Sequence, residues 1–375
     1  MMLPYGRQSI DDEDIAAVTA ALRGDFLTTG PTVGAFEAAL SARLGGPGCV
    51  AVTSGTAALH VAYAAIGIRP GDEVITTPIT FVATAAAAVL QGAKVVFADV
   101  EAETANLDAA AVDALVTTRT RAITAVDYAG HPAEYEALTK VARRADVTLI
   151  ADAAHSIGST YRGVPVGSLA DVTTLSFFPT KNVTTGEGGA VAATDPAVLD
   201  RARRFANQGT VRERELMRAP DEGGWFYETH SFGLNYRLPD VLCALGLSQL
   251  RRLGQFKAAR ARLVARYHEM LADVPGLTVP AQRAWADPMW HLYPVRIADG
   301  RRREVYDRMR AAGVGVQVNY VPVHLHPVFQ DLGYRAGMCP VAERFYSEEL
   351  SLPLFADLTD ADQERAVEAL RAVLG

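Results

Sequence analysis

A lysine at the end of an apolar stretch is the first residue whose surroundings indicate chemistry. Lys181 lies in "LSFFPTKNVTTGEGGA" (175–190), and it is one of four lysines in a chain with 36 Lys and Arg residues. Burial of an amine lowers its pKa, because the charged form loses its hydration. A neutral amine is nucleophilic and suited to forming an imine with an aldehyde. The alternative is a side chain that runs along the surface and keeps its ammonium group in water.

Two further stretches place polar groups at the ends of strand-like runs. Asp152, in "ADAAHS", ends an apolar run, where a carboxylate needs a partner such as a cationic ring nitrogen or local backbone N–H groups. In "TSGTAAL" a strand ends at Ser54, and a helix begins at Gly55 and Thr56. The free N–H groups of a helix start bind anions such as phosphate. Ser54 or Thr56 could instead be a simple N-cap.

Together these features match the needs of one cofactor. The helix start at Gly55 and Thr56, which could bind a phosphate, precedes Asp152 in the chain, and Lys181 follows Asp152 by 29 residues. Pyridoxal 5'-phosphate (PLP) needs a grip on its phosphate, an acid beside its pyridinium nitrogen and a Schiff-base lysine. Phe81, in "TPITFVAT", is a candidate for stacking on the ring, or else a core aromatic residue. The combination indicates a PLP site.

The elements that must position these residues alternate between strands and helices. Ala-rich stretches over 55–67 and roughly 80–91 have the character of helices. Such alternation predicts an α/β fold with a mostly parallel central sheet covered by helices. The predicted strands, rich in Val and Ile, are 49–54, 72–78, 94–100, 121–127, 147–155, 172–178 and 189–194.

The pattern changes from about Pro239. Residues 239–273 keep apolar residues at helical spacing, and Gly254 is a point where this helix bends or divides. A strand at "HLYPVRI", a helix over 302–312, a strand at "GVGVQVNYVP" and two closing helices follow. We therefore predict an N-terminal arm and large domain over 1–250, and a smaller α+β domain over 251–375.

Composition excludes several classes of protein. The net charge of −7 argues against a general nucleic-acid binder. Cys49, Cys243 and Cys339 form neither a disulfide framework nor a zinc pattern, which fits a reducing cytoplasm. The start of the chain has no signal-peptide core. The most apolar window, 76–97, is interrupted by polar residues and predicts no membrane span.

The spacing of the histidines does not predict a metal site. His324 and His326, in "HLH", have a spacing that could share one strand face. No carboxylate or cysteine near them in the sequence completes a site, so we expect no bound metal.

A series of stretches in one order carries a resemblance that spans nearly the whole chain. The chain resembles the DegT/DnrJ/EryC1/StrS sugar aminotransferases, which have the PLP fold-type I architecture of aspartate aminotransferase. The resemblance implies a homodimer with shared active sites, with PLP and pyridoxamine phosphate as the two cofactor forms. The stretches are "LPYGRQSID", "LTTGP", "TSGTAALH", "TTPITFVAT", "VDYAGHPAE", "IADAAHSIGS", "SFFPTKNVTTGEGGA", "FGLNYRLPD", "ALGLSQL" and "NYVPVH".

The resemblance also implies roles for single residues. Lys181 matches the catalytic lysine that holds the cofactor as a Schiff base. Asp152 would pair with the pyridine nitrogen, Phe81 would lie on the ring face, and His155 would lie near the ring hydroxyl. The implied phosphate contacts are Gly55, Thr56, Ser176 and, from the second subunit, Asn235. The implied sugar-nucleotide contacts are Tyr5, Leu27, Thr28 and Tyr320.

The implied reaction moves an amino group from L-glutamate to the keto carbon, expected at C4, of a nucleotide-linked 4-keto-6-deoxy sugar. The subgroup that looks most similar makes pseudaminic acid and acts on UDP-2-acetamido-2,6-dideoxy-hexos-4-ulose. The chain departs from that subgroup at Phe178 and Asn319, where its members often carry His. Arg7 and Arg237 are both candidates for binding a diphosphate or the carboxylate of the donor.

Three alternatives remain open at this point. One is an aminotransferase for a dTDP-4-keto-6-deoxyhexose or another keto sugar. A sugar dehydratase of the same fold would typically carry histidine at the place of Lys181. A non-catalytic PLP-binding sensor would need an added DNA-binding segment, and turnover with glutamate would exclude it.

Overall fold

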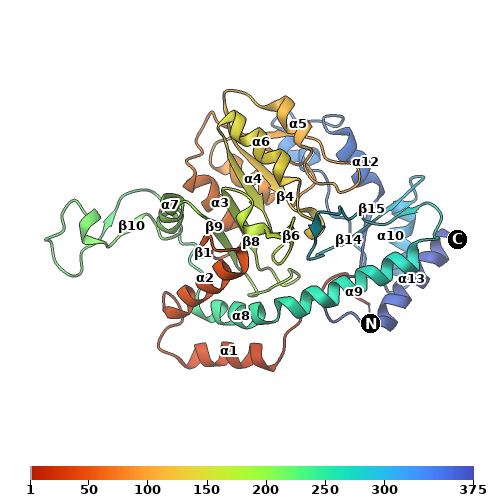
Figure 1. Ribbon diagram of the computed structural model, residues 1–375, viewed down its shortest axis with the longest axis horizontal. Coiled ribbons are helices and arrows are strands. Elements are labelled where there is room, and N and C mark those ends of the chain that lie inside the picture. Colours follow the sequence, from red (N-terminus) through yellow and green to blue (C-terminus); the bar gives the residue numbers. More distant parts are fainter. Residues whose placement is uncertain (1) are drawn as a thin grey trace.

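A seven-stranded sheet in the order β1-β9-β8-β5-β4-β2-β3 forms the centre of the molecule, seen here in a computed structural model that describes residues 2–375 (Figure 1). Neighbouring strands from β3 to β8 are parallel, whereas β9 runs antiparallel to both β8 and β1. The predicted mostly parallel sheet is therefore confirmed. Its strands are β1 (Gly48–Val52), β2 (Glu73–Thr76), β3 (Lys94–Phe97), β4 (Thr120–Val126), β5 (Thr148–Asp152), β8 (Val172–Ser176) and β9 (Gly189–Ala193).

Alternate side chains of each strand enter two different cores. Ile150 packs with the cluster that contains α3, whereas Leu149 and Ala151 pack with the cluster that contains α6. Burial on both faces explains why these strands are continuous apolar runs. The helices that cover the sheet are α2 (Pro31–Leu44), α3 (Gly55–Ala65), α4 (Ala83–Leu90), α5 (Ala109–Leu115), α6 (Tyr135–Ala145) and α7 (Pro196–Ala206).

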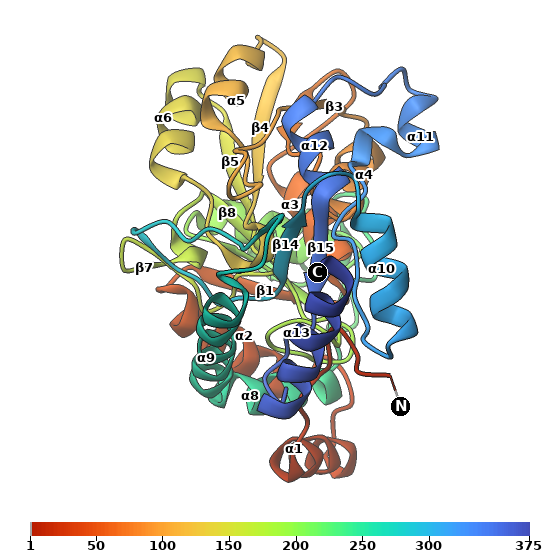
Figure 2. The ribbon, with the colours of Figure 1, turned by 90° about the vertical axis from the view of Figure 1, so that its right-hand side faces the viewer.

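The C-terminal third of the chain builds a second, three-stranded sheet in the order β12-β14-β15. Figure 2 shows α10 and α13 beside β14 and β15, at the side where both chain ends lie. All strands of the seven-stranded sheet precede residue 250 and those of this sheet follow it, while the exact domain division stays a prediction. The elements are β12 (Leu277–Thr278), β14 (Tyr293–Ile297), β15 (Glu349–Leu352), α10 (Arg302–Ala311), α11 (Pro327–Gln330), α12 (Pro340–Glu348) and α13 (Asp360–Leu374).

The long predicted helix is divided into α8 (Asp240–Arg251) and α9 (Leu253–Leu271), which run one after the other along the molecule (Figure 1). The break falls at Arg252, two residues before Gly254. Among residues 2–375, no helix combines the length and the apolar character that are needed to cross a membrane.

The predicted strand over 313–322 is wrong. The segment forms only isolated bridges, from Val314 to Leu3 and from Gln317 to Ser351. Beyond Gln317 the backbone leaves the ladder, because the N–H of Asn319 donates to the carboxylate of Glu349 at 2.7 Å instead of to a strand. The third strand of the sheet is β15, which the sequence pattern had not predicted.

An arm between α7 and α8 extends away from the body (Figure 1). It carries the short antiparallel strands β10 (Thr210–Val211) and β11 (Glu228–Thr229). Its aromatic side chains are unusually open, with Phe232 98% and Trp225 79% exposed. The other elements are the helix α1 (Asp12–Arg23) and the two-residue strands β6 (Thr160–Tyr161), β7 (Val164–Pro165) and β13 (Ala286–Asp287).

Candidate active site

A cavity of about 600 Å³ lies where the parallel strands end. Val126, Asp152 and Ser176, the last residues of β4, β5 and β8, all line it. Ligands of open α/β sheets bind at this edge, outside the carboxyl ends of the strands. The cavity also receives Lys181 from the loop after β8 and Tyr320 from the segment before α11.

Asp152 is buried and fixed by two hydrogen bonds. The hydroxyl of Thr84 donates to Oδ2 at 2.7 Å, and the N–H of Ala154 donates to Oδ1 at 3.2 Å. Burial raises the pKa of Asp152, while these bonds and the charge of Lys181 act in the opposite direction. Thr84 is a site residue that sequence reasoning missed, although it lies three positions after Phe81.

Lys181 has the lowered pKa that its position predicts. Burial lowers the pKa of its amine to about 8, and the nearby carboxylate of Asp152 limits the change. Its backbone N–H donates to the carbonyl of Phe178 at 2.9 Å, in a tight turn after β8. The amine forms no ion pair within residues 2–375 and faces the cavity. With a pKa of about 8, roughly a tenth of this amine is neutral and nucleophilic at pH 7, far more than for an ordinary lysine.

The start of α3 lies against the end of β8. The side chain of Ser54 caps the helix by accepting from the N–H of Ala57 at 3.0 Å. A Cβ atom added to Gly55 would lie 2.7 Å from Cβ and 2.9 Å from Oγ of Ser176. Only glycine allows this close approach, which brings the N-terminus of the helix, Thr56 and Ser176 to one wall of the cavity.

The rings of Phe81, His155 and Tyr320 also line the cavity. The hydroxyl of Tyr320 lies 3.1 Å from Nε2 of His155, and the Phe81 ring meets that of Tyr320 edge-on at 6.3 Å. Phe81 is 59% exposed, which favours a ring that faces the cavity over a core residue. Burial holds the pKa of His155 well below its ordinary value, so its imidazole is neutral.

His291 is a further site residue that the sequence did not reveal. Its ring packs against that of His155 with centroids 4.3 Å apart and the planes tilted by 36°, and it lines the cavity. The motif "HLYPVRI" signalled only a strand, and His291 lies two residues before β14.

The predicted substrate residues divide into two groups. Tyr5 and Tyr320 line the cavity, together with Gln317 and Asn319. Leu27 and Thr28 do not, and both lie exposed between α1 and α2. Asn235, predicted to contact the cofactor phosphate of the other subunit, is also outside the cavity and lies exposed at the base of the arm. Within one chain, these three are apart from the site.

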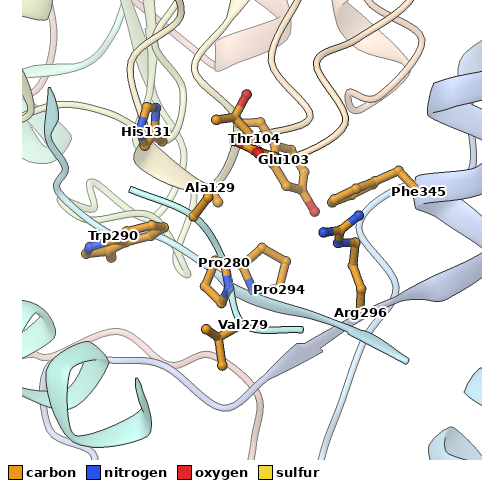
Figure 3. Close-up of a pocket in the computed structure, with 12 residues that line it drawn as sticks. Glu103, Thr104, Ala129, His131, Val279, Pro280, Trp290, Pro294, Arg296 and Phe345 are labelled. Atoms are coloured by element: carbon orange, nitrogen blue, oxygen red, sulfur yellow. The ribbon is translucent and has the colours of Figure 1, made fainter. Parts of the chain in front are cut away.

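A second hollow, shown in Figure 3, lies elsewhere and has room for about one water-sized group. It is lined by His131, Trp290 and Arg296, and by none of the residues predicted for the site. Nε2 of His131 accepts from the N–H of Arg283 at 3.1 Å, and burial lowers the pKa of the ring to about 4. This histidine is a neutral structural residue.

His324 does have a carboxylate partner, contrary to the sequence interpretation. Nε2 of His324 lies 2.9 Å from Oε1 of Glu343, which is 19 residues further along the chain. A pair of this kind is a buried structural contact. Among residues 2–375 no group of three or more His, Cys, Asp or Glu side chains gathers as metal ligands.

Fold and site together define a PLP-dependent aminotransferase class, and comparison with known proteins gives the family. The model of the DegT/DnrJ/EryC1/StrS aminotransferase family matches residues 8–371, so the chain belongs to this family. The structure of Spr1654 from Streptococcus pneumoniae is known in a PLP form and a PMP form; it is 28% identical, with a TM-score of 0.93, and the match to the PLP form covers 100% of this chain and 98% of that one.

Curated relatives span the same length. The chain is 36% identical to the spore coat polysaccharide biosynthesis protein SpsC of Bacillus subtilis, over 99% of this chain and 97% of that protein. It is 34% identical to a UDP-4-amino-4,6-dideoxy-N-acetyl-beta-L-altrosamine transaminase of Campylobacter jejuni, over 100% and 98%. The structure of PseC from Helicobacter pylori, an aminotransferase of pseudaminic acid biosynthesis, has a TM-score of 0.94 at 30% identity, covering 100% and 99%.

Proposed function

We propose that this protein transfers the amino group of L-glutamate to C4 of a nucleotide-linked 4-keto-6-deoxy sugar. The acceptor we favour is UDP-2-acetamido-2,6-dideoxy-hexos-4-ulose, as in pseudaminic acid synthesis. The proposal places the enzyme in the cytoplasm, where nucleotide sugars are made.

The lining of the large cavity carries this proposal. Around the Lys181–Asp152 pair it offers hydroxyls, amides, aromatic rings, backbone and the carboxylate of Glu187, and no arginine. Carboxylate substrates are usually held by guanidinium groups. A neutral sugar with many hydroxyls suits such a wall better, and the relatives from Campylobacter jejuni and Helicobacter pylori support a 4-keto sugar.

The residues at the sheet edge fit PLP. Gly55 leaves a space against Ser176 that a side chain would fill, which suits a phosphate at the start of α3. Nδ1 of His155 is buried without a hydrogen-bond partner in residues 2–375, and its ring lies in the same cavity. We assign phosphate binding to Gly55, Thr56 and Ser176, and the ring nitrogen to Asp152.

When bound, the cofactor supplies an electrophilic carbon and an electron sink. Lys181, whose pKa is lowered by burial to about 8, would hold the cofactor and then carry a proton to and from the reacting carbon. Asp152 keeps a proton on the ring nitrogen, and the hydroxyl of Thr84 orients its carboxylate. Phe81, whose ring meets that of Tyr320 edge-on, would pack on the cofactor ring, and Tyr320 would contact the sugar substrate.

The substrate assay offers purified enzyme L-glutamate with either the UDP-linked 4-keto-N-acetyl sugar or dTDP-4-keto-6-deoxyglucose. Mass spectrometry of the sugar product decides between them. Clear preference for the dTDP sugar would reject the pseudaminic assignment and keep the sugar-aminotransferase class. Activity on neither would contradict the proposed reaction.

We also propose a homodimer that shares its sites. Leu27, Thr28 and Asn235 lie outside the cavity of their own chain, on exposed segments that a second copy could bring to it. Mixing inactive Lys181→Ala with impaired Asn235→Ala subunits should restore activity, because one site of each heterodimer then holds both native residues. A fully active monomer at assay concentration would reject this arrangement.

A further inference from the structure

The segment 317–320, which lines the large cavity, is not held as a strand along its whole length. At its start, Gln317 exchanges two backbone hydrogen bonds with Ser351 of β15, at 3.2 and 2.7 Å. Within residues 2–375, the backbone N–H groups of residues 318–322 donate to no backbone carbonyl. Beyond Gln317 the segment therefore depends on side chains for its position.

Glu349, the first residue of β15, supplies one of these side chains. Its Oε2 accepts from the N–H of Asn319 at 2.7 Å, and its Oε1 lies 2.6 Å from the hydroxyl of Ser351. On the other side, the hydroxyl of Tyr128 donates to the carbonyl of Asn319. Tyr128 follows β4 of the seven-stranded sheet, so the backbone of Asn319 is held between the two sheets of the molecule.

Glu349 is an acid in an unfavourable place. It is completely buried, and it forms no ion pair in the part of the chain that is described. Burial raises the pKa of its carboxyl to about 8, while the hydrogen bonds from Ser351 and Asn319 and the charge of Arg302 act in the opposite direction. An apolar side chain would fill the same space without the cost of burying a carboxyl group. The hydrogen bonds that Glu349 makes therefore explain why an acid is present.

The backbone that Glu349 holds leads directly into the site. Tyr320 follows Asn319, its hydroxyl lies 3.1 Å from Nε2 of His155, and its ring meets that of Phe81. A displacement of Asn319 would therefore move Tyr320 relative to the cofactor end. Even a small misplacement of groups that orient a substrate lowers the rate of an enzyme strongly.

We propose that Glu349 is a positioning residue for the keto-sugar acceptor: it fixes the 317–320 wall of the cavity without touching the sugar itself. Glu349 is not part of the cavity lining. This inference rests on the proposed function, because it takes the 317–320 segment as part of the sugar end. Lys181 and Asp152 are positioned by the seven-stranded sheet and the loop after β8, so loss of Glu349 affects the acceptor much more than the reaction with L-glutamate.

The first test measures hydrogen exchange of the PLP-loaded protein, without substrate. Glu349→Leu fills the space but accepts no hydrogen bond, so the N–H of Asn319 should exchange about tenfold faster, as expected for the loss of one hydrogen bond. Glu349→Gln should keep the protection, because its amide carbonyl can accept from Asn319 while its NH2 group donates to Ser351. Glu348→Leu is the matched control, since Glu348 pairs with Arg344 at 3.1 Å instead.

The second test separates the two substrates by kinetics. Glu349→Leu should raise the KM for the keto sugar about tenfold, again the effect of one hydrogen bond, while the conversion of bound PLP by L-glutamate changes little. Glu349→Gln should restore the KM. Tyr128→Phe, which keeps the ring and removes the opposite bond to Asn319, should change exchange and KM in the same direction as Glu349→Leu.

Three results would overturn the inference: unchanged exchange of Asn319 in Glu349→Leu, equal losses with both substrates, or no recovery in Glu349→Gln. The exchange experiment needs no sugar. A failure of the proposed function, seen as transfer to neither keto sugar by the wild-type enzyme, is therefore distinguishable from a failure of the hydrogen bonds assigned to Glu349.

Discussion

The two ends of the large cavity are built in different ways. The cofactor end comes from consecutive strand ends of one sheet, with Asp152 closing β5 and Ser176 closing β8. The sugar end comes from segments far apart in the chain, such as Tyr5 and the 317–320 segment. Two residues expected at that end, Leu27 and Thr28, lie outside the cavity of their own chain.

This difference separates chemistry from specificity. The cofactor end is fixed by a rigid, doubly covered sheet, whose geometry follows from local patterns. The sugar end depends on loops, which are more variable than the elements they connect. Substitutions at the cofactor end should therefore remove the reaction itself, and those at the sugar end should change which substrate is used.

The largest effect is expected for Lys181→Ala. Transamination should fall by on the order of 10³-fold or more, because both the attachment point and the proton carrier are lost. Lys257→Ala is the control, since that amine pairs with Asp287 at 2.6 Å on the surface. Borohydride reduction of the wild-type protein, followed by peptide mapping, should fix the cofactor to Lys181. A label on another lysine would contradict the assignment.

Asp152→Asn should leave cofactor attachment intact and lower the rate on the order of 10²-fold, a loss typical for an electrostatic partner of the reacting group. Thr84→Val removes only the hydroxyl that donates to Asp152, so its effect should be smaller. Single-turnover absorbance with glutamate measures both. A near-normal rate for Asp152→Asn would show that the cofactor end tolerates loss of its acid.

Gly55→Ala tests the close contact between α3 and β8. The added methyl group would displace Ser176, and PLP should bind about tenfold more weakly, as expected when a positioned hydrogen bond to a charged group is lost. Gly254→Ala is the matched control, because nothing lies within 4 Å of a Cβ at that helical position. It should raise the free energy of unfolding by about 0.5–1 kcal/mol. Equal affinity for PLP in both variants would contradict the assignment of phosphate binding to Gly55, Thr56 and Ser176.

The smallest effect is a pH shift. Apo protein should capture PLP faster as pH rises through about 8, where the amine of Lys181 loses its proton. Since Asp152 raises the pKa of Lys181, Asp152→Asn should move this rise to lower pH. The folded state releases the proton before the unfolded chain does, so stability should also increase with pH between about 8 and 10.5. Stopped-flow absorbance and denaturant titration measure the two quantities, and a rise only near pH 10 would contradict the burial of Lys181.

Much of the cofactor end could be predicted because each part depends on a short stretch. Apolar runs located the strands, and polar residues at their ends located Asp152 and Lys181. Thr84 and His291 were missed, since their roles arise from contacts at 2.7 Å and 4.3 Å with residues far along the chain.

The errors have the same origin. The segment over 313–322 has the composition of a strand. However, the N–H of Asn319 donates to the side chain of Glu349, so it is not available for pairing with another strand. His324 seemed without a carboxylate because Glu343 approaches only through the packing of α12.

The arm gives the molecule an optical reporter. The chain has three tryptophans, Trp225, Trp285 and Trp290. Trp225 in the arm is 79% exposed, whereas Trp290 in the body is 4% exposed. An indole in water fluoresces at longer wavelength than one in an apolar surrounding. The long-wavelength part of the emission spectrum therefore comes mainly from Trp225 in the arm. If a second subunit covers this side chain, dilution that separates the subunits should shift the emission to longer wavelength, without any added label.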